Sequence, residues 1–144
     1  MTEHAGQILG DVHMLPVRVY YEDTDFSGAV YHANYIKFCE RGRTDCLRLL
    51  GIFHGALHGT ASFVVRRMVC DFLKPAGIDD LLQVETRFKA FSGARMELVQ
   101  RVLRGADVLF SADVTVAMVD GKGRPTRVPA EMAATFLSRM QSHK

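Results

Sequence analysis

Residues 20–35 read YYEDTDFSGAVYHANY, and they form the densest run of functional side chains in the chain. Glu22, Asp23 and Asp25 lie close together there, and His32 follows at the start of a segment with helical periodicity. An acidic side chain before a helix commonly acts as a cap, because the helix dipole favours anions at that end. A cap needs one acid and does not need a histidine beside it. We therefore expect a functional site here, with a plain helix cap as the alternative for Asp25.

The segment that follows predicts one long helix from about His32 to Leu50. Its apolar stripe recurs at helical spacing and comprises Tyr35, Cys39, Gly42, Cys46 and Leu49. Gly51 directly after this segment favours termination of the helix. Glycine inside a helix costs up to about 1 kcal/mol relative to alanine. We therefore expect another part of the protein to pack closely against the helix backbone at Gly42.

The remaining chain predicts strands, because residues 62–73 are rich in valine and phenylalanine and residues 80–91 and 94–103 alternate between apolar and polar side chains. One strand, from Leu15 to Tyr21, precedes the functional stretch. After the helix we expect a meander of four strands, separated by proline- or glycine-containing turns, at residues 62–73, 80–91, 94–103 and 108–119. Pro129 then begins a short amphipathic helix that reaches Met140. A single antiparallel sheet must cover the long helix, so the fold class is α+β, and the open sheet edges predict a homodimer or homotetramer.

Length and composition favour one globular domain. The 144 residues divide into a flexible N-terminal tail at 1–14 and a domain at 15–141, and the 48% of hydrophobic residues suffices for a core. The net charge of +2 and the lack of a basic cluster argue against nucleic acid binding. No run approaches the roughly 18 apolar residues of a transmembrane segment. The three cysteines lack metal-binding spacing and indicate reduced thiols in a cytoplasm.

The acidic stretch resembles the signature of a known family. Glu22 to Asp25, Gly28 and residues 30–35 are similar to hotdog-fold acyl-CoA thioesterases, and within them to the YbgC-like, Tol–Pal-associated group related to 4-hydroxybenzoyl-CoA thioesterases. The runs 63–68 and 75–76 are similar to that group as well, and the resemblance spans about residues 16–136. It implies the hotdog fold, an antiparallel β-sheet wrapped around one long central helix, which agrees with the periodicity. It also implies hydrolysis of acyl-CoA to free acid and coenzyme A.

The resemblance assigns roles to particular residues. Asp25 corresponds to the catalytic carboxylate, and the backbone N–H of His32 to the donor that polarises the thioester carbonyl. The His32 side chain also falls on an active-site position of the group, where substrate orientation or general acid–base catalysis competes with a plain hydrogen-bonding role. Glu22 and Asp23 are expected to support the turn. Phe26 and Ser27 stand where many members have smaller residues. This departure bears on the shape of the pocket, and so on which acyl chain is preferred, more than on the chemistry.

These residue types suit thioester hydrolysis. A helix N-terminus offers unpaired N–H groups to an oxyanion, and one such donor is typically worth about 2.7–4 kcal/mol. Asp25 could act as general base on water or attack the carbonyl itself to form a mixed anhydride, and the sequence leaves both routes open. Further candidates for substrate binding are Tyr31, Phe26, Arg66, Arg67, Lys89 and Arg95. The four cations among them could contact the coenzyme A phosphates. Taken singly, each of these cations fits a solvated strand residue better than a phosphate contact.

Other functions remain as alternatives. Asp23, Asp25 and His32 could be metal ligands, but no further ligand stands at suitable spacing, so we expect no metal and no cofactor. The chain could be an acyl dehydratase or hydratase. It could also be an interaction module that binds acyl carrier protein or the Tol–Pal envelope machinery with little turnover. We expect a cytoplasmic protein, with a peripheral position at the inner membrane as the alternative.

Overall fold

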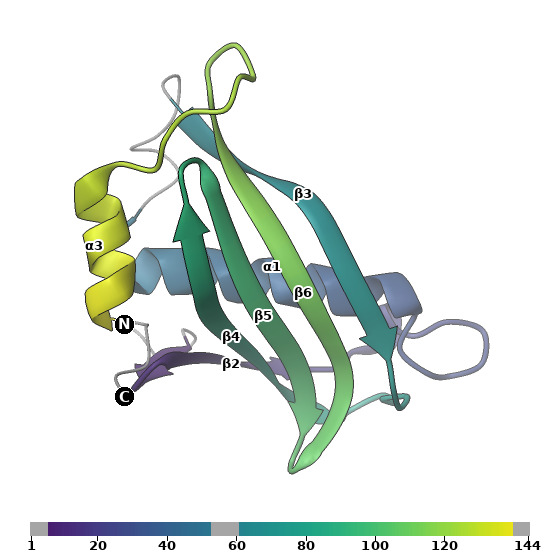
Figure 1. Cartoon of the computed structure of the whole chain (residues 1–144). Coiled ribbons are helices and arrows are strands. Elements are labelled where there is room, and N and C mark those ends of the chain that lie inside the picture. The colour runs from purple at the N-terminus through teal and green to yellow at the C-terminus, as the bar shows by residue number, and fades with distance from the viewer. Residues whose placement is uncertain (1–5, 53–60, 140–144) are drawn as a thin grey trace.

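The computed structural model describes residues 6–52 and 61–139, in which one antiparallel sheet wraps around one long helix (Figure 1). The strands are β1 (Gln7–Leu9), β2 (Val12–Arg18), β3 (Ala61–Phe72), β4 (Leu81–Ser92), β5 (Arg95–Arg104) and β6 (Asp107–Asp120). The helices are the short 3₁₀ turn η1 (Tyr21–Asp23), the long α1 (His32–Leu49) and the C-terminal α3 (Ala130–Arg139). The expected α+β class and the wrapped sheet are confirmed.

The strands follow the spatial order β1-β2-β4-β5-β6-β3, which corrects the predicted four-strand meander. β4, β5 and β6 do form a meander with tight turns. β3 instead lies beyond β6 and pairs with it antiparallel, from Ala61 opposite Asp120 to Phe72 opposite Phe110. The N–H groups of Leu73 and Lys74 both donate to the Leu109 carbonyl, which keeps the end of β3 beside β6. The chain then crosses to β4 at the far side of the meander.

The predicted N-terminal tail is wrong for residues 7–14, while residues 1–5 lie outside the described part. β1 pairs with β2, which begins at Val12 rather than Leu15. His13 is buried, and its Nε2 lies 2.7 Å from Asp45 Oδ2 on α1. The Gly6 N–H donates to the same oxygen at 2.9 Å. The predicted strand also ends earlier than expected, at Arg18, before η1.

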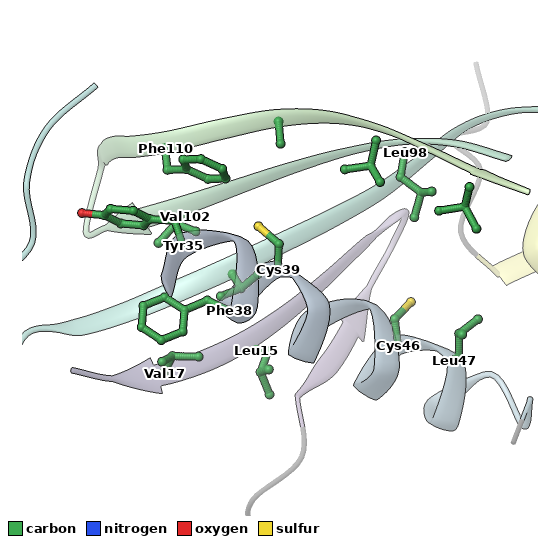
Figure 2. Close-up of a cluster of buried hydrophobic side chains, with 14 of the residues drawn as sticks. Leu15, Val17, Tyr35, Phe38, Cys39, Cys46, Leu47, Leu98, Val102 and Phe110 are labelled. Carbon is green, nitrogen blue, oxygen red and sulfur yellow. The ribbon is translucent and has the colours of Figure 1, made fainter. Parts of the chain in front are cut away.

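The core lies between α1 and the concave face of the sheet. Figure 2 shows Tyr35, Cys39 and Cys46 projecting from α1 toward the strands, as the predicted stripe requires. The Tyr35 ring stacks on Phe110 of β6 with ring centroids 5.3 Å apart. Phe38, outside the predicted stripe, is also fully buried. Helix burial is therefore wider than the periodicity indicated.

Close packing at Gly42 is confirmed. A Cβ atom there would lie 2.9 Å from Val84 Cγ1 of β4. Gln100 of β5 reaches the helix backbone at the same level and donates from Nε2 to the Cys39 carbonyl at 2.9 Å. The same nitrogen donates to Thr86 Oγ1 at 2.9 Å. The glycine lets the sheet approach the helix closely enough for this buried amide to bond to it.

The two edges of the sheet differ. β1 has three residues, whereas β3 has 12 and pairs along one side with β6. Val64, Val65 and Val69 on β3 are 36–45% exposed. At the other end of the chain, α3 buries Phe136 against Phe88, with ring centroids 4.5 Å apart, and Met140 lies outside the described part. None of the helices in the described ranges is long and apolar enough to cross a membrane.

Candidate active site

Asp25 lies in the tight turn that connects η1 to α1. Thr24 and Val30 form an isolated antiparallel bridge across it. The Asp25 N–H donates to the Ala29 carbonyl at 2.8 Å, and the Gly28 N–H donates to the Asp25 carbonyl at 3.0 Å. Gly28 has a φ of 88°, a conformation that side chains other than glycine rarely adopt. This explains why the chain has a glycine at that position.

The Asp25 carboxylate is fixed by Ser27 and otherwise faces solvent. Its Oδ1 accepts hydrogen bonds from the Ser27 hydroxyl at 2.5 Å and from the Ser27 backbone N–H at 2.8 Å. These hydrogen bonds lower the pKa of Asp25, the hydroxyl contributing most, and the nearby His32 charge lowers it a little further. Asp25 is therefore an ionised carboxylate near neutral pH. Ser27 thus acts on the proposed catalytic group, whereas the sequence linked it only to pocket shape.

Asp23 supports the turn, as predicted. Its carboxylate is buried and accepts from the Tyr20 N–H at 2.9 Å and from Asn34 Nδ2 at 3.1 Å. Its backbone carbonyl accepts from the Tyr31 N–H at 2.9 Å. Asp23 and Asn34 together tie η1 to the first turn of α1. The sequence marked Asn34 as part of the motif but gave it no role.

The N-terminus of α1 opens beside this turn. Tyr31 caps the helix without a side-chain hydrogen bond, and His32 is the first helical residue. The His32 backbone N–H has no acceptor among residues 6–52 and 61–139, as expected for the first turn of a helix. It is thus available to a ligand oxygen. The positive end of the helix dipole adds to its attraction for an anion.

The His32 ring lies between two other aromatic side chains. Its centroid is 4.6 Å from that of Tyr31 and 6.0 Å from that of Phe72, which meets it edge-on. Phe72 is half-exposed and rests on Phe110, 5.0 Å between centroids. Sequence reasoning missed Phe72, because it lies on β3, far along the chain. An apolar residue at the end of a strand gives no local signal of this contact.

The segment between β3 and β4 is hydrogen-bonded to the turn that carries Asp25. The Tyr35 hydroxyl accepts a hydrogen bond from the Ala76 N–H at 3.0 Å. The Ala76 carbonyl accepts one from the Val30 N–H at 2.9 Å. Burial raises the pKa of Tyr35, so the hydroxyl stays neutral. The Pro75-Ala76 pair, which resembles the thioesterase pattern, thus helps to position the turn that carries Asp25.

A cavity of about 270 Å³ lies between α1 and the sheet, beside β3. Its strand side is apolar and includes Phe63, Phe88 and Leu98, while its helix side includes Glu40 and Arg43. Glu40 lies about two helical turns beyond His32, or about 12 Å along the axis. The cavity is therefore remote from the Asp25 of the same chain.

Comparison with known proteins identifies the family. Residues 19–136 match the family model of the thioesterase-like superfamily. The chain belongs to the thioesterase-like superfamily. It is 45% identical over 124 residues to the acyl-CoA thioesterase YbgC of Haemophilus influenzae, an alignment covering 84% of this chain and 91% of that protein. It is 40% identical to the acyl-CoA thioester hydrolase YbgC of Escherichia coli O6:H1, over 84% of this chain and 92% of the relative.

A solved structure agrees with the sequence comparison. A probable thioesterase from Bartonella henselae superposes with a TM-score of 0.79 at 42% identity, covering 82% of this chain and 99% of that one. This thioesterase-like chain is thus a YbgC homologue with a hotdog fold. The resemblance drawn from residues 20–35 and the predicted fold are both confirmed.

The cations that the sequence suggested for substrate binding are not gathered around Asp25 in this chain. Arg66, Arg67, Lys89 and Arg95 are all exposed. Arg95 and Val64 both pair with Ala117, so Arg95 is level with the beginning of β3. Phe72, which contacts His32, lies at the opposite end of that strand.

Phe26 and Tyr31, the other predicted substrate contacts, flank the turn. Phe26 is fully exposed, and Tyr20, Tyr21 and Tyr31 are 46–81% exposed around it. An exposed aromatic group of this kind marks a surface that a ligand or another protein covers. The part of the chain that the structure describes contains no cluster of three His, Cys, Asp or Glu side chains suited to a metal ion.

Proposed function

We propose that this protein is an acyl-CoA thioesterase, which hydrolyses acyl-CoA to a free acid and coenzyme A. The observation that carries the proposal is an ionised Asp25 carboxylate, fixed by Ser27, beside the open N-terminus of α1. The curated relatives named acyl-CoA thioesterase and thioester hydrolase support the same activity.

In the proposed reaction, the thioester carbonyl oxygen accepts a hydrogen bond from the His32 backbone N–H. As negative charge develops on that oxygen, the N–H and the helix dipole stabilise it. Asp25 removes a proton from water, the hydroxide adds to the carbonyl carbon, and the C–S bond breaks to release the coenzyme A thiolate. In the second route, an Asp25 oxygen adds to the carbonyl carbon, the C–S bond breaks to release the coenzyme A thiolate, and water then hydrolyses the mixed anhydride to the free acid and regenerates Asp25. The His32 ring orients the thioester, and neither route uses a metal or cofactor.

Two copies are proposed to complete the site. β3 is a long edge strand with half-exposed valines, and antiparallel pairing of β3 with a second β3 would satisfy its open edge. A two-fold axis at that edge makes the two α1 helices antiparallel. The Asp25 turn of one protomer then approaches the α1–β3 cavity of its partner. That cavity would receive the acyl chain, and Arg66, Arg67, Lys89 and Arg95 would be available to the coenzyme A phosphates. Pairing of two such dimers would give a tetramer.

Asp25→Asn tests the catalytic assignment. We expect thiol release from a panel of acyl-CoAs to fall by at least about 100-fold, since a general base is worth roughly 10²–10⁴-fold. Asp113→Asn, an exposed acid on β6, is the matched control and should retain activity. Hydrolysis by Asp25→Asn at the wild-type rate would reject Asp25 as the catalytic carboxylate.

Val69→Lys tests the proposed dimer, because Val69 is exposed on β3 and is not among the residues that line the cavity. A lysine on the edge strand should shift the mass measured by light scattering to that of a monomer and should abolish hydrolysis, because the acyl cavity and Asp25 would be separated. Gln83→Lys, on β4 inside the sheet, is a control for the added charge. A wild-type chain that is monomeric and fully active would contradict the shared site.

The same assays address the remaining alternative. If the wild-type chain cleaves no acyl thioester but binds acyl carrier protein or Tol–Pal components, it is an interaction module instead. Cys39 and Cys70 are thiols outside any disulfide in the described residues, which supports the proposed cytoplasmic location. A peripheral position at the inner membrane belongs to the interaction alternative and would be tested by fractionation.

A further inference from the structure

Arg43 places a cation in the wall of the apolar α1–β3 cavity. Its Nη1 donates to Gln100 Oε1 at 2.9 Å. Gln100 is itself fully buried and uses its amide nitrogen on the Cys39 carbonyl and on Thr86. The guanidinium is therefore held by a rigid buried amide. Burial also lowers the pKa of Arg43, which reflects the cost of keeping its charge out of water.

The guanidinium retains donors for a ligand. An arginine has five N–H donors, and the described residues give this one a single side-chain acceptor. No carboxylate in the described ranges lies within ion-pair distance of it, including Glu40 on the same cavity wall. The Glu40 charge acts on Arg43 from beyond ion-pair distance and offsets only part of the cost of burying this cation, since the pKa of Arg43 is still lowered. Holding Gln100 alone would require only a neutral donor.

We propose that Arg43 recognises an oxygen at the distal end of the acyl group, so that this thioesterase favours acyl-CoAs whose chain ends in a carboxylate or a hydroxyl. This inference rests on the proposed function, which places the acyl chain in the cavity. The apolar strand wall contacts the methylene groups of the chain. The remaining N–H groups of Arg43 donate to the terminal oxygen, and a charge-assisted hydrogen bond of this kind is stronger than a neutral one.

Chain length should determine where this preference appears. Arg43 lies about three turns beyond His32, or about 16 Å along α1, so only a long chain could reach it from the Asp25 of the same protomer. A thioester held by the partner's turn would reach it with a shorter chain. The shortest acyl group whose terminal oxygen changes the rate thus reports the distance between the reacting carbonyl and Arg43.

The experiment compares kcat/KM for acyl-CoAs of equal chain length that end in a methyl, a hydroxyl or a carboxylate. We expect wild type to favour an oxygen-bearing end over methyl by about tenfold or more at one or more lengths, because the analogue without oxygen leaves the buried donors unpaired. Arg43→Met should lose this preference, and Arg43→Lys should keep part of it. Arg41→Met is the matched control, since Arg41 is exposed on the same helix, and it should retain the wild-type ratio.

The ratio of two kcat/KM values is independent of the fraction of folded enzyme, so a loss of stability in Arg43→Met does not affect the test. The inference is overturned if wild type favours methyl-ended chains at every length, or if Arg43→Met keeps the wild-type ratio. Carboxylate and hydroxyl substrates are distinguished by their separate ratios. If no acyl-CoA is hydrolysed, the proposed function fails and this inference fails with it.

Discussion

Ser27 donates two hydrogen bonds to the same carboxylate oxygen of Asp25, from its hydroxyl at 2.5 Å and from its backbone N–H at 2.8 Å. The residues are two apart in an Asx-type turn, so the catalytic candidate and its support come from one short segment. The two bonds stabilise the charged form and leave the second carboxylate oxygen available to water or substrate.

Ser27→Ala should therefore change the pH dependence of hydrolysis. The Ser27 bonds lower the pKa of Asp25, so they keep it ionised to lower pH than an ordinary aspartate. Without the hydroxyl, this pKa should rise toward its usual value, and the acid limb of kcat/KM should move to higher pH. Ser92→Ala, at the distant β4–β5 turn, should leave the profile unchanged. Identical acid limbs for Ser27→Ala and wild type would show that Asp25 protonation does not limit the reaction.

Phe72→Leu should impair catalysis more than folding. Leucine retains apolar volume but loses the edge-on contact with His32, 6.0 Å between centroids. Because aromatic pairs are worth about 0.5–1.5 kcal/mol, we expect a fall of about two- to tenfold in kcat/KM. Phe91→Leu removes a comparable ring contact, with Phe136 at 5.1 Å, away from Asp25. Equal losses of activity in the two variants would contradict a positioning role for Phe72.

Gly42→Ala should destabilise the protein even though alanine favours helices. The added Cβ would lie 2.9 Å from the buried Val84 Cγ1 and 3.3 Å from Thr86 Oγ1. Overpacking of this kind costs about 1–3 kcal/mol, which exceeds the gain of up to about 1 kcal/mol in helix propensity. Urea unfolding measures the difference. Gly77→Ala, where a Cβ meets nothing within 4 Å, is the control and should stay within about 0.5 kcal/mol of wild type.

Acid should weaken the attachment of the N-terminal hairpin to α1. Burial lowers the pKa of His13, although its contact with Asp45 opposes that shift, and Nδ1 has no partner in the described part of the chain. The unfolded chain then binds a proton more readily than the folded one. The free energy of unfolding should fall as pH decreases below about 6.5, by at most about 1.4 kcal/mol per pH unit, and should level off below the folded pKa.

Thermal unfolding at pH 8 and pH 5.5 measures this effect. Besides Asp45, the charged Arg48 faces the pair, 3.4 Å from Asp45 Oδ1, and it stays protonated at both pH values. His13→Leu should reduce the difference in Tm between the two pH values, and His32→Ala, which changes an exposed histidine, should preserve it. A pH dependence unaffected by His13→Leu would assign the effect to another group.

The sequence by itself determined the features that depend on near neighbours along the chain. Helical spacing predicted α1 to within one residue of its observed end, because burial of one helix face repeats every three to four residues. Alternation located β4 and β5 in the same way, and the valine- and phenylalanine-rich composition of residues 62–73 located β3. Gly42 predicted a close approach to the helix, and the acidic motif predicted a supporting role for Asp23.

The tertiary structure decided what depends on pairing between distant segments. Strands of similar alternation can pair in several orders, and the pattern does not say that β3 joins β6 rather than β4. The polar segment before Leu15 resembled a tail until Asp45 supplied acceptors for His13 and Gly6. Phe72 meets His32, and Arg43 enters an apolar cavity, because the sheet curls around α1. Burial and hydrogen bonding of this kind are properties of the assembled fold, so they are absent from the local pattern.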